Sequence, residues 1–500
     1  MFEKMEKMLF FYLIIILLNI IISKEDIISF KIETFQYKGE YSNPTIINQL
    51  YDSNLVTTMN IGSNSYPLKS FVEAQNHYFY ISTKCNIQKS FFSDYKTNFN
   101  YNRHKSYSFF NTSSFNLDFS QSNNACTANE DFEIFKANKM ETSKEKLSFI
   151  LTEDTNEEIP NCLRIGLLEN TNKDSTFSEY NLITQLKHKN HIKFTCWSII
   201  FNTPVNYNND NLLVSADELL NLKGNLIIGD YPHNLDKEKF YKSQMANAYI
   251  KIESNIMKWE LEFDKIYYLD NDKEIKIMGD KRAIFDPSNY FIIAPEDYFD
   301  QIITKFFQKY KNDNICNYDY LEEYTTIYCE KSSKFSINEI KQFPSLFFVH
   351  TQLGYTFEIS YKDLFIENNG KYWFLLISDT EFMRDQWVLG NIFMRKYQLV
   401  FNLESREISF YNPNLEKIEN GEENVPKDSS KIILYVLLII ALCIILIGVG
   451  IFIKMKFYPS GIKKKRANEL DDDFEYVSHK NNNNNNNDDN QLFNNSINQE

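Results

Sequence analysis

Glycine and positive charge are both scarce in this sequence of 500 residues. With only 13 glycines, tight turns that need a positive φ must often use asparagine, which tolerates that conformation better than most residues. The 53 lysines and arginines are outnumbered by 67 aspartates and glutamates, so the net charge is −14. Because nucleic-acid binding requires a basic face, we expect no nucleic-acid partner.

Clustered metal ligands are also missing. No Cys-x-x-Cys motif and no close cysteine–histidine spacing suggests zinc, and we expect neither a metal nor a cofactor. Hydrophobic residues make up 43% of the chain and aromatic residues 16%, which is enough to fill sizeable cores. The sequence is therefore that of a globular protein over most of its length.

The N-terminus has the pattern of a secretory signal peptide. Within residues 1–23, Lys4 and Lys7 precede a short apolar run, and charged residues follow it at once. This order of a basic, an apolar and a polar part is typical of a cleaved signal. A retained signal anchor is the alternative interpretation. If the signal is cleaved, residues 24–44 form a short leader at the start of the mature chain.

A second apolar run, residues 432–453, contains no charged residue and is long enough to cross a bilayer as a helix. Lysines and an arginine follow between 454 and 466, and segments rich in these residues stay on the cytosolic side. We therefore predict a single-pass type I membrane protein with a lumenal or extracellular body. Residues 416–431 would be a juxtamembrane linker, and the asparagine-rich tail 454–500 is predicted to be disordered.

The cysteines agree with this topology, because all but one lie before the predicted membrane helix, in an oxidising compartment. Disulfides are therefore expected. The pairing of Cys85, Cys126, Cys162 and Cys196 stays open. Asn111 begins a glycosylation sequon on the same side of the membrane.

A segment from Ala283 to Pro295 places an acidic residue between two apolar runs. Both runs are typical of buried strands, and Asp-Pro-Ser-Asn between them is typical of a turn, so Asp286 would stand at its tip. An ordinary surface turn is the alternative. About a hundred residues later, a second apolar segment leads to Gly390 and continues to Tyr397.

These two segments, in this order, resemble the C-terminal lobe of pepsin-like aspartic proteases. The second motif matches that family at Trp387, Leu389, Gly390, Phe393, Arg395, Tyr397 and Phe401. The resemblance implies an all-β, bilobal pepsin-like fold with an N-terminal lobe at 45–205, an inter-lobe segment at 206–245 and a C-terminal lobe at 246–415. It also implies a disulfide between Cys316 and Cys329.

The first lobe keeps less of the family's pattern. A hydrophobic-Gly loop is present at Gly166, and the strand at 79–82 leads to Cys85 at the family's spacing. Counting back from that strand, however, puts the first catalytic aspartate at Val72. A shift by one residue would make Glu73 a weak substitute, but an ordinary strand residue facing solvent is the preferred interpretation of Glu73.

Other parts of the implied substrate site are also changed. Phe119 stands where the family has a flap tyrosine, and Pro287 replaces the threonine after the second aspartate. Ser288 and Asn289 complete that turn, so Phe119, Ser288 and Asn289 are the candidate substrate-binding residues. Aspartic proteases work through two carboxyls that share one proton, and Asp286 is the single catalytic aspartate retained.

The sequence therefore predicts an aspartyl-protease-family protein that is catalytically inactive and binds a peptide or protein in its inter-lobe cleft, as a monomer on a membrane anchor. An active membrane-anchored aspartic endopeptidase is the alternative, and a surface protein without a working cleft is a third hypothesis. A carboxylate close to Asp286 would favour the enzyme. We expect desolvation to raise the pKa of Asp286.

Overall fold

The computed structural model describes residues 26–36, 44–82, 110–115, 125–152, 163–168, 180–202, 213–250, 257–270, 273–277, 279–320, 324–379 and 386–417. These all belong to one compact unit, Met1–Asn420. The predicted signal peptide, membrane helix and cytosolic tail lie outside the described residues, as does Phe119. None of the helices in the described part is long and apolar enough to cross a membrane.

The fold is mostly β, as predicted. The largest sheet formed by the described residues has 13 strands. In order of pairing they are β12 (Met245–Tyr249), β27 (Glu407–Tyr411), β26 (Leu399–Asn402), β9 (Cys196–Phe201), β11 (Lys223–Ile228), β1 (Ile28–Gln36), β2 (Ser53–Ile61), β3 (Tyr66–Glu73), β8 (Leu163–Gly166), β4 (Phe79–Ser82), β7 (Glu141–Thr152), β6 (Ala125–Lys136) and β5 (Phe110–Phe115).

Two further sheets come from the second half of the chain. One contains β10 (Val214–Ser215), β22 (Phe365–Asn368), β23 (Lys371–Phe374), β19 (Tyr324–Glu330), β24 (Leu376–Asp379), β17 (Ile292–Ala294), β25 (Trp387–Leu389), β16 (Arg282–Phe285) and β13 (Glu260–Glu262), with β18 (Cys316–Tyr320) paired to β19. The other contains β15 (Lys273–Lys276), β14 (Lys265–Asp270), β20 (Leu346–His350) and β21 (Tyr355–Ile359).

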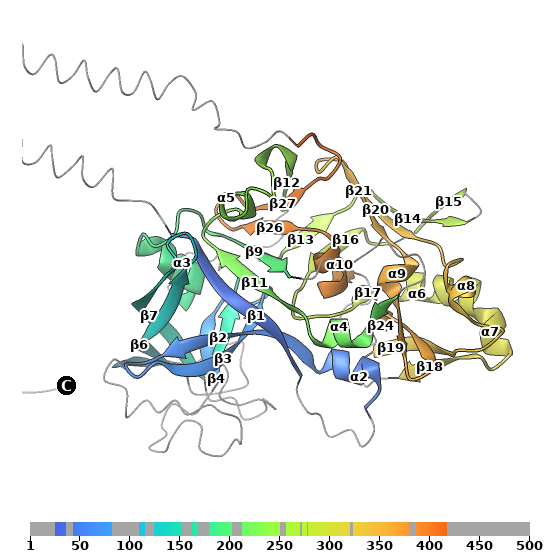
Figure 1. Ribbon diagram of the computed structural model, residues 1–500, viewed down its shortest axis with the longest axis horizontal. Helices are drawn as coiled ribbons and strands as arrows, with labels where there is room; N and C mark the ends of the chain where they lie inside the picture. Colours follow the sequence, from blue (N-terminus) through green and yellow to red (C-terminus); the bar gives the residue numbers. More distant parts are fainter. Residues whose placement is uncertain are drawn as a thin grey trace, which may run out of the picture. The chain divides into compact units, whose positions relative to one another are not determined.

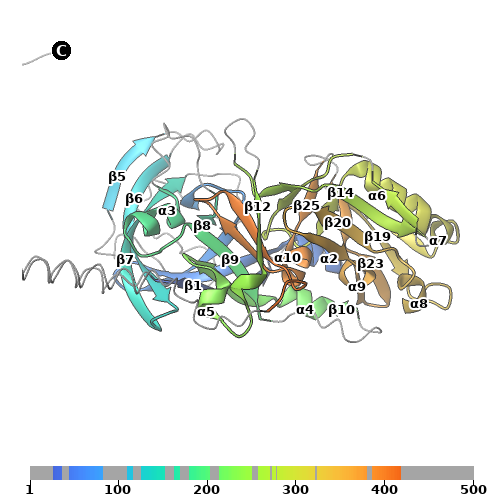
Figure 2. The same cartoon turned by 90° about the horizontal axis from the view of Figure 1, so that it is seen from above.

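The helices are short and connect or cover these sheets. They are α2 (Ile46–Tyr51), α3 (Leu182–His188), α4 (Ala216–Leu220), α5 (Pro232–Leu235), η3 (Lys242–Gln244), α6 (Glu296–Ile302), the π-helical turn η4 (Ile303–Phe307), α7 (Gln308–Asn312), α8 (Ile337–Ile340), α9 (Tyr361–Leu364) and α10 (Asn391–Lys396). Strands β2 to β8 and strands β14 to β24 lie on opposite sides of a central group that includes β9 (Figure 1; Figure 2).

Strands from both halves of the chain meet in the largest sheet. β26 pairs with β9, so that Phe401 lies opposite Trp197. Their rings stack with centroids 4.1 Å apart, and Trp259 packs edge-on against both. The two indole N–H groups donate to the carbonyl oxygen of Leu167, each at 3.2 Å. This shared aromatic core connects the two lobes directly behind the turns described below.

The N-terminal leader is part of this sheet, which corrects the expected start of the first lobe at residue 45. β1 occupies Ile28–Gln36 and pairs with both β11 and β2. Ile28, Phe30 and Ile32 are buried on one face, and the residues between them are more exposed. This alternation is the pattern of a half-buried strand. The alternation is visible in the sequence itself.

Three cysteine side chains can be assigned in the described part of the chain, one pair and one free thiol. Cys316 and Cys329 form the predicted disulfide between directly paired positions of β18 and β19. Cys196 is free and fully buried, so it forms none of the disulfides considered for it, and burial raises the pKa of its thiol. Cys85 and Cys162 lie outside the described residues. Asn111 lies on β5, the last strand of its sheet.

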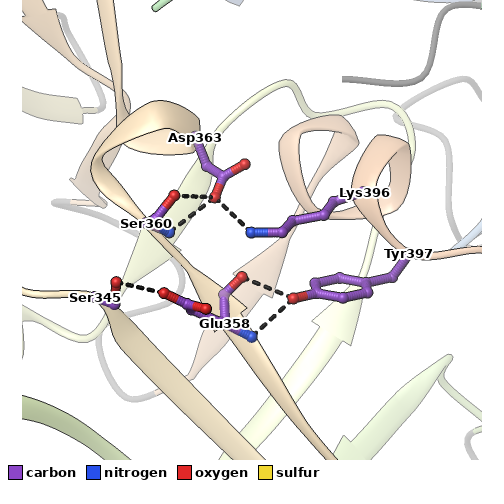
Figure 3. Close-up of polar contacts among 6 residues, drawn as sticks. All are labelled: Ser345, Glu358, Ser360, Asp363, Lys396 and Tyr397. Carbon is purple, nitrogen blue, oxygen red and sulfur yellow. Dashed lines mark hydrogen bonds and ion pairs between the residues drawn. The ribbon is translucent and has the colours of Figure 1, made fainter. Parts of the chain in front are cut away.

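Helix α10 is held at its C-terminal end by polar contacts to α9 and β21 (Figure 3). Lys396 Nζ lies 2.9 Å from the buried Asp363 carboxylate, which also accepts hydrogen bonds from Ser360. The Tyr397 hydroxyl donates to the carbonyl oxygen of Glu358 at 2.7 Å and accepts from its N–H at 2.8 Å. Tyr397 therefore fixes the exposed edge of β21 relative to α10.

Candidate functional site

Two turns, one in each lobe, have the same strand environment. In the first lobe, β8 pairs in parallel with β3 and antiparallel with β4, so that Ile165 lies opposite both Val72 and Phe79. In the second lobe, β25 pairs in parallel with β16 and antiparallel with β17, and Leu389 lies opposite both Phe285 and Ile292. The turns that follow Val72 and Phe285 are therefore structurally equivalent.

A glycine beside each turn confirms the predicted equivalence of Gly166 and Gly390. Gly166 N–H donates to the carbonyl oxygen of Tyr78 at 2.9 Å, and Gly390 N–H donates to that of Phe291 at 3.1 Å. A Cβ on Gly166 would lie 2.5 Å from Tyr78 N, and one on Gly390 would lie 2.5 Å from the Phe291 oxygen. Both positions require glycine because the turn backbone passes so close.

This register corrects the position expected to face Asp286. Val72 and Phe285 are each 1% exposed and belong to the core, whereas Glu73 and Asp286 follow them on the opposite face. Glu73, not Val72, lies opposite Gly166. The count from Phe79 failed because it went back seven residues, whereas Phe79 is equivalent to Ile292, and Ile292 lies six residues after Asp286. The residues equivalent to Asp286-Pro-Ser-Asn are thus Glu73-Ala-Gln-Asn.

Asp286 is held by its own turn. Its Oδ1 accepts from Ser288 N at 3.0 Å and from Ser288 Oγ at 2.6 Å. The residue keeps a partial opening to solvent, but protein surrounds the carboxyl group. Desolvation raises its pKa above the ordinary value, the Ser288 hydrogen bonds oppose that rise, and the negative charge of Glu73 adds to it. The predicted direction is confirmed.

Glu73 is held by residues of its own lobe. Its Oε1 accepts from Arg164 Nη1, and its Oε2 accepts from Asn76 Nδ2 at 2.7 Å. The Arg164 guanidinium lies over the ring of Phe71, 5.4 Å from its centroid. In the described part of the chain, no hydrogen bond joins the carboxyl groups of Glu73 and Asp286. The charge of Glu73 acts on Asp286 without a direct hydrogen bond between them.

One side chain bridges the two turns. Gln75 Nε2 donates to the carbonyl oxygen of Phe285 at 2.9 Å, across a sequence separation of 210 residues. Gln75 Oε1 is buried and has no hydrogen-bond partner among the described residues. Ala74 and the equivalent Pro287 have no hydroxyl group, and Pro287 also lacks a backbone N–H. Gln75 is thus the polar side chain that links the turn after β3 to β16.

A pocket of about 510 Å³ lies between the two turns. It is lined by Asn54, Glu73, Ala74, Gln75, Asn76, His77, Tyr78, Arg164, Asp286 and Ser288. Of the predicted site residues, Asp286, Ser288 and Glu73 therefore meet in one place. Asn289 instead shapes its turn, since its Oδ1 accepts from Phe291 N at 2.8 Å. Arg164 and Gln75 were missed because only the pairing register places them here.

Residues 56–412 match the family described as eukaryotic aspartyl protease. The chain belongs to this family. No curated protein shows a significant match to the sequence. In aspartic proteases two carboxyls share one proton at the site of hydrolysis. In this eukaryotic aspartyl protease family member, the equivalent positions hold Glu73 and Asp286, and the first of these is paired with arginine.

Proposed function

We propose that this protein binds a peptide or protein segment in the pocket beside Asp286 and does not hydrolyse it. One observation carries this proposal. The carboxylate that should share a proton with Asp286 belongs to Glu73, and it is bound by Arg164 and Asn76 instead. Because Arg164 binds Oε1 and Asn76 binds Oε2, both oxygens of Glu73 are engaged within their own lobe, and neither is hydrogen-bonded to Asp286 to share a proton with it.

The surroundings of the two carboxyls support the same conclusion. Hydrolysis by this family needs one carboxyl to activate a water and the other to protonate the substrate. Each acid or base contribution of this kind is worth on the order of 10²–10⁴-fold in rate. The pocket itself remains open, polar and lined from both lobes. A protein that binds a peptide without hydrolysing it still needs this pocket, but it does not need two carboxyls that share a proton.

We further infer that the protein is held in a membrane by the apolar run 432–453, with its body lumenal or extracellular. The support is the run itself and the basic residues that follow it. Extraction of cell membranes with alkaline carbonate should leave the full-length chain in the membrane pellet. An antibody against the tail 454–500 should reach it in intact cells only after the plasma membrane is permeabilised. Release of the chain into the soluble fraction would contradict the anchor.

The activity test uses the purified full-length chain and a denatured protein substrate across the acidic range. We expect no cleavage that depends on acid, and we expect the same chain to retain short extended peptides from a defined library. Asp286→Asn should leave the cleavage assay unchanged. A preparation that binds no peptide would contradict the proposed function.

An active endopeptidase is the second candidate, and one observation favours it. Glu73 is structurally equivalent to Asp286, and its charge contributes to the raised pKa of that residue. Two carboxyls that interact in one pocket are the starting point of acid–base catalysis. Acid-dependent cleavage that is lost in both Asp286→Asn and Glu73→Gln would establish this enzyme. Arg164→Met should then increase the rate, because it would release Glu73.

A further inference from the structure

Gln75 lines the pocket and carries a buried acceptor without a hydrogen-bond partner among the described residues. Its amide nitrogen donates to the Phe285 carbonyl oxygen of the other lobe at 2.9 Å, and this bond fixes which way the amide points. Its Oε1 then lies buried without a partner within the described region, although Gln75 lines the pocket. Buried acceptors are almost always satisfied, and leaving one unpaired is costly. A missing donor is therefore indicated at this point.

We propose that Gln75 Oε1 accepts a main-chain N–H of an extended peptide that lies in the pocket beside Asp286. This inference rests on the proposed peptide-binding function and names the residue that reads the peptide backbone. Gln75 acts through its fixed amide, so it is a specificity-determining residue and takes no part in proton transfer. A peptide N–H bound here would lie near Phe285, whose carbonyl oxygen Gln75 contacts across the two lobes, and near Asp286, which lines the same pocket.

The charges around the pocket favour a neutral donor over a cationic one. Arg164 lines the same pocket and would repel an ammonium group, while Glu73 is already paired with it. The desolvation that raises the pKa of Asp286 shows that the site penalises charge. A backbone amide satisfies Gln75 without bringing a new charge into that environment.

The site is also organised before the ligand arrives. Because the Gln75 amide is held by a backbone carbonyl, a peptide does not have to order this side chain on binding. The equivalent residue in the other turn, Ser288, is likewise engaged, since its hydroxyl donates to Asp286. Each turn therefore holds one polar group of the pocket in a fixed position, the Gln75 amide in one turn and the Asp286 carboxyl in the other.

The test is an N-methyl scan of a peptide that the full-length chain retains from a library of short extended peptides. Each backbone N–H is replaced by N-methyl in turn, and the Kd of each analogue is measured for the wild type and for Gln75→Met. One position should weaken binding to the wild type about tenfold when methylated, as expected for a buried acceptor left unpaired. In Gln75→Met the same methylation should cost nothing, which is the signature of a direct contact in a double-mutant cycle.

Two further variants separate recognition from a structural role. Gln398 also joins the lobes through a side-chain amide, donating to the Ile199 carbonyl oxygen at 3.0 Å, but it does not line the pocket. Gln398→Met should keep the full penalty at the sensitive position. Gln75→Leu also lacks the acceptor and should lose the penalty in the same way, so the proposal stays testable if Gln75→Met does not fold.

The outcomes divide cleanly. A library from which the wild type retains no peptide contradicts the proposed function and this inference together. Two results overturn this inference alone. In the first, peptide binds but methylation of no single N–H weakens binding. In the second, methylation of one N–H weakens binding to Gln75→Met as much as to the wild type. Loss of the penalty in Gln398→Met would show that loosening the lobes is sufficient, and that result would also overturn it. If the chain instead prefers peptides that bind through a terminal ammonium group, the donor to Gln75 Oε1 is a cation, and the proposed backbone amide is wrong.

Discussion

Removing one hydroxyl group, in Tyr397→Phe, should destabilise the second lobe measurably. The ring of Tyr397 is buried against Phe357 and Phe393, so the substitution leaves the packing in place. The hydroxyl makes two hydrogen bonds to the backbone of Glu358, and both are lost. At about 1 kcal/mol net for each bond, the free energy of unfolding should fall by about 2 kcal/mol.

The assay is urea unfolding of the full-length chain, with tryptophan fluorescence as the readout. The midpoint should move to lower urea with an unchanged slope, because the surface exposed on unfolding is the same. Burial raises the pKa of Tyr397 far above its ordinary range, so the hydroxyl stays protonated and the loss should be equal in mild acid and at neutral pH.

Tyr355→Phe is the matched control. Tyr355 packs in the same aromatic cluster, with its ring centroid 6.0 Å from that of Tyr397. Its hydroxyl has no hydrogen-bond partner among the described residues, so its removal should change the free energy of unfolding by less than about 0.5 kcal/mol. Equal effects of the two substitutions, or an effect of Tyr397→Phe below about 0.5 kcal/mol, would refute the assignment of Tyr397 as the anchor of β21.

Two other substitutions test the site and the second lobe. The folded-state pKa of Asp286 is raised above its ordinary value of 3.8, so the stability linked to its protonated form is fully present below pH 3.8 and is lost as pH rises through the folded-state pKa. Asp286→Asn should therefore raise the free energy of unfolding at neutral pH and change it little in strong acid, because Asn keeps an acceptor for Ser288. The measurement is urea unfolding at both pH values. Equal effects at the two would contradict desolvation as the cause of the raised pKa. Replacing Cys316 and Cys329 by serine should lower stability by about 3 kcal/mol, the chain-entropy value for so short a loop. Wild type treated with reductant should unfold at the same urea concentration as this double variant, and a difference between them would point to strain introduced by the serines.

The local sequence pattern was sufficient to predict the structure where the residues of a single turn or strand decide it. The apolar runs around Asp286 became β16 and β17, and Gly166 and Gly390 were placed correctly because only glycine allows the backbone to pass so close. The scarcity of glycine also had the expected consequence, since Asn190 and Asn314 both adopt positive φ. The strand β1 could have been found from its alternation as well.

The partner of Asp286 could not be found from spacing. The choice between Val72 and Glu73 depends on which residue is counted as equivalent to Phe79, and a shift of one residue in a strand exchanges the core face for the cleft face. Only the pairing of β3 with β8 decides which of the two side chains is buried. Sequence counting has no access to that register.

The sequence by itself determined the family, the position of Asp286 and the pair Cys316–Cys329, because each rests on residues whose local chemistry is distinctive. The tertiary structure alone decided what surrounds Asp286. Arg164 reaches Glu73 across 91 residues of sequence, and Gln75 reaches Phe285 across 210. Such contacts follow from the register and the closure of two lobes, and no local pattern encodes them.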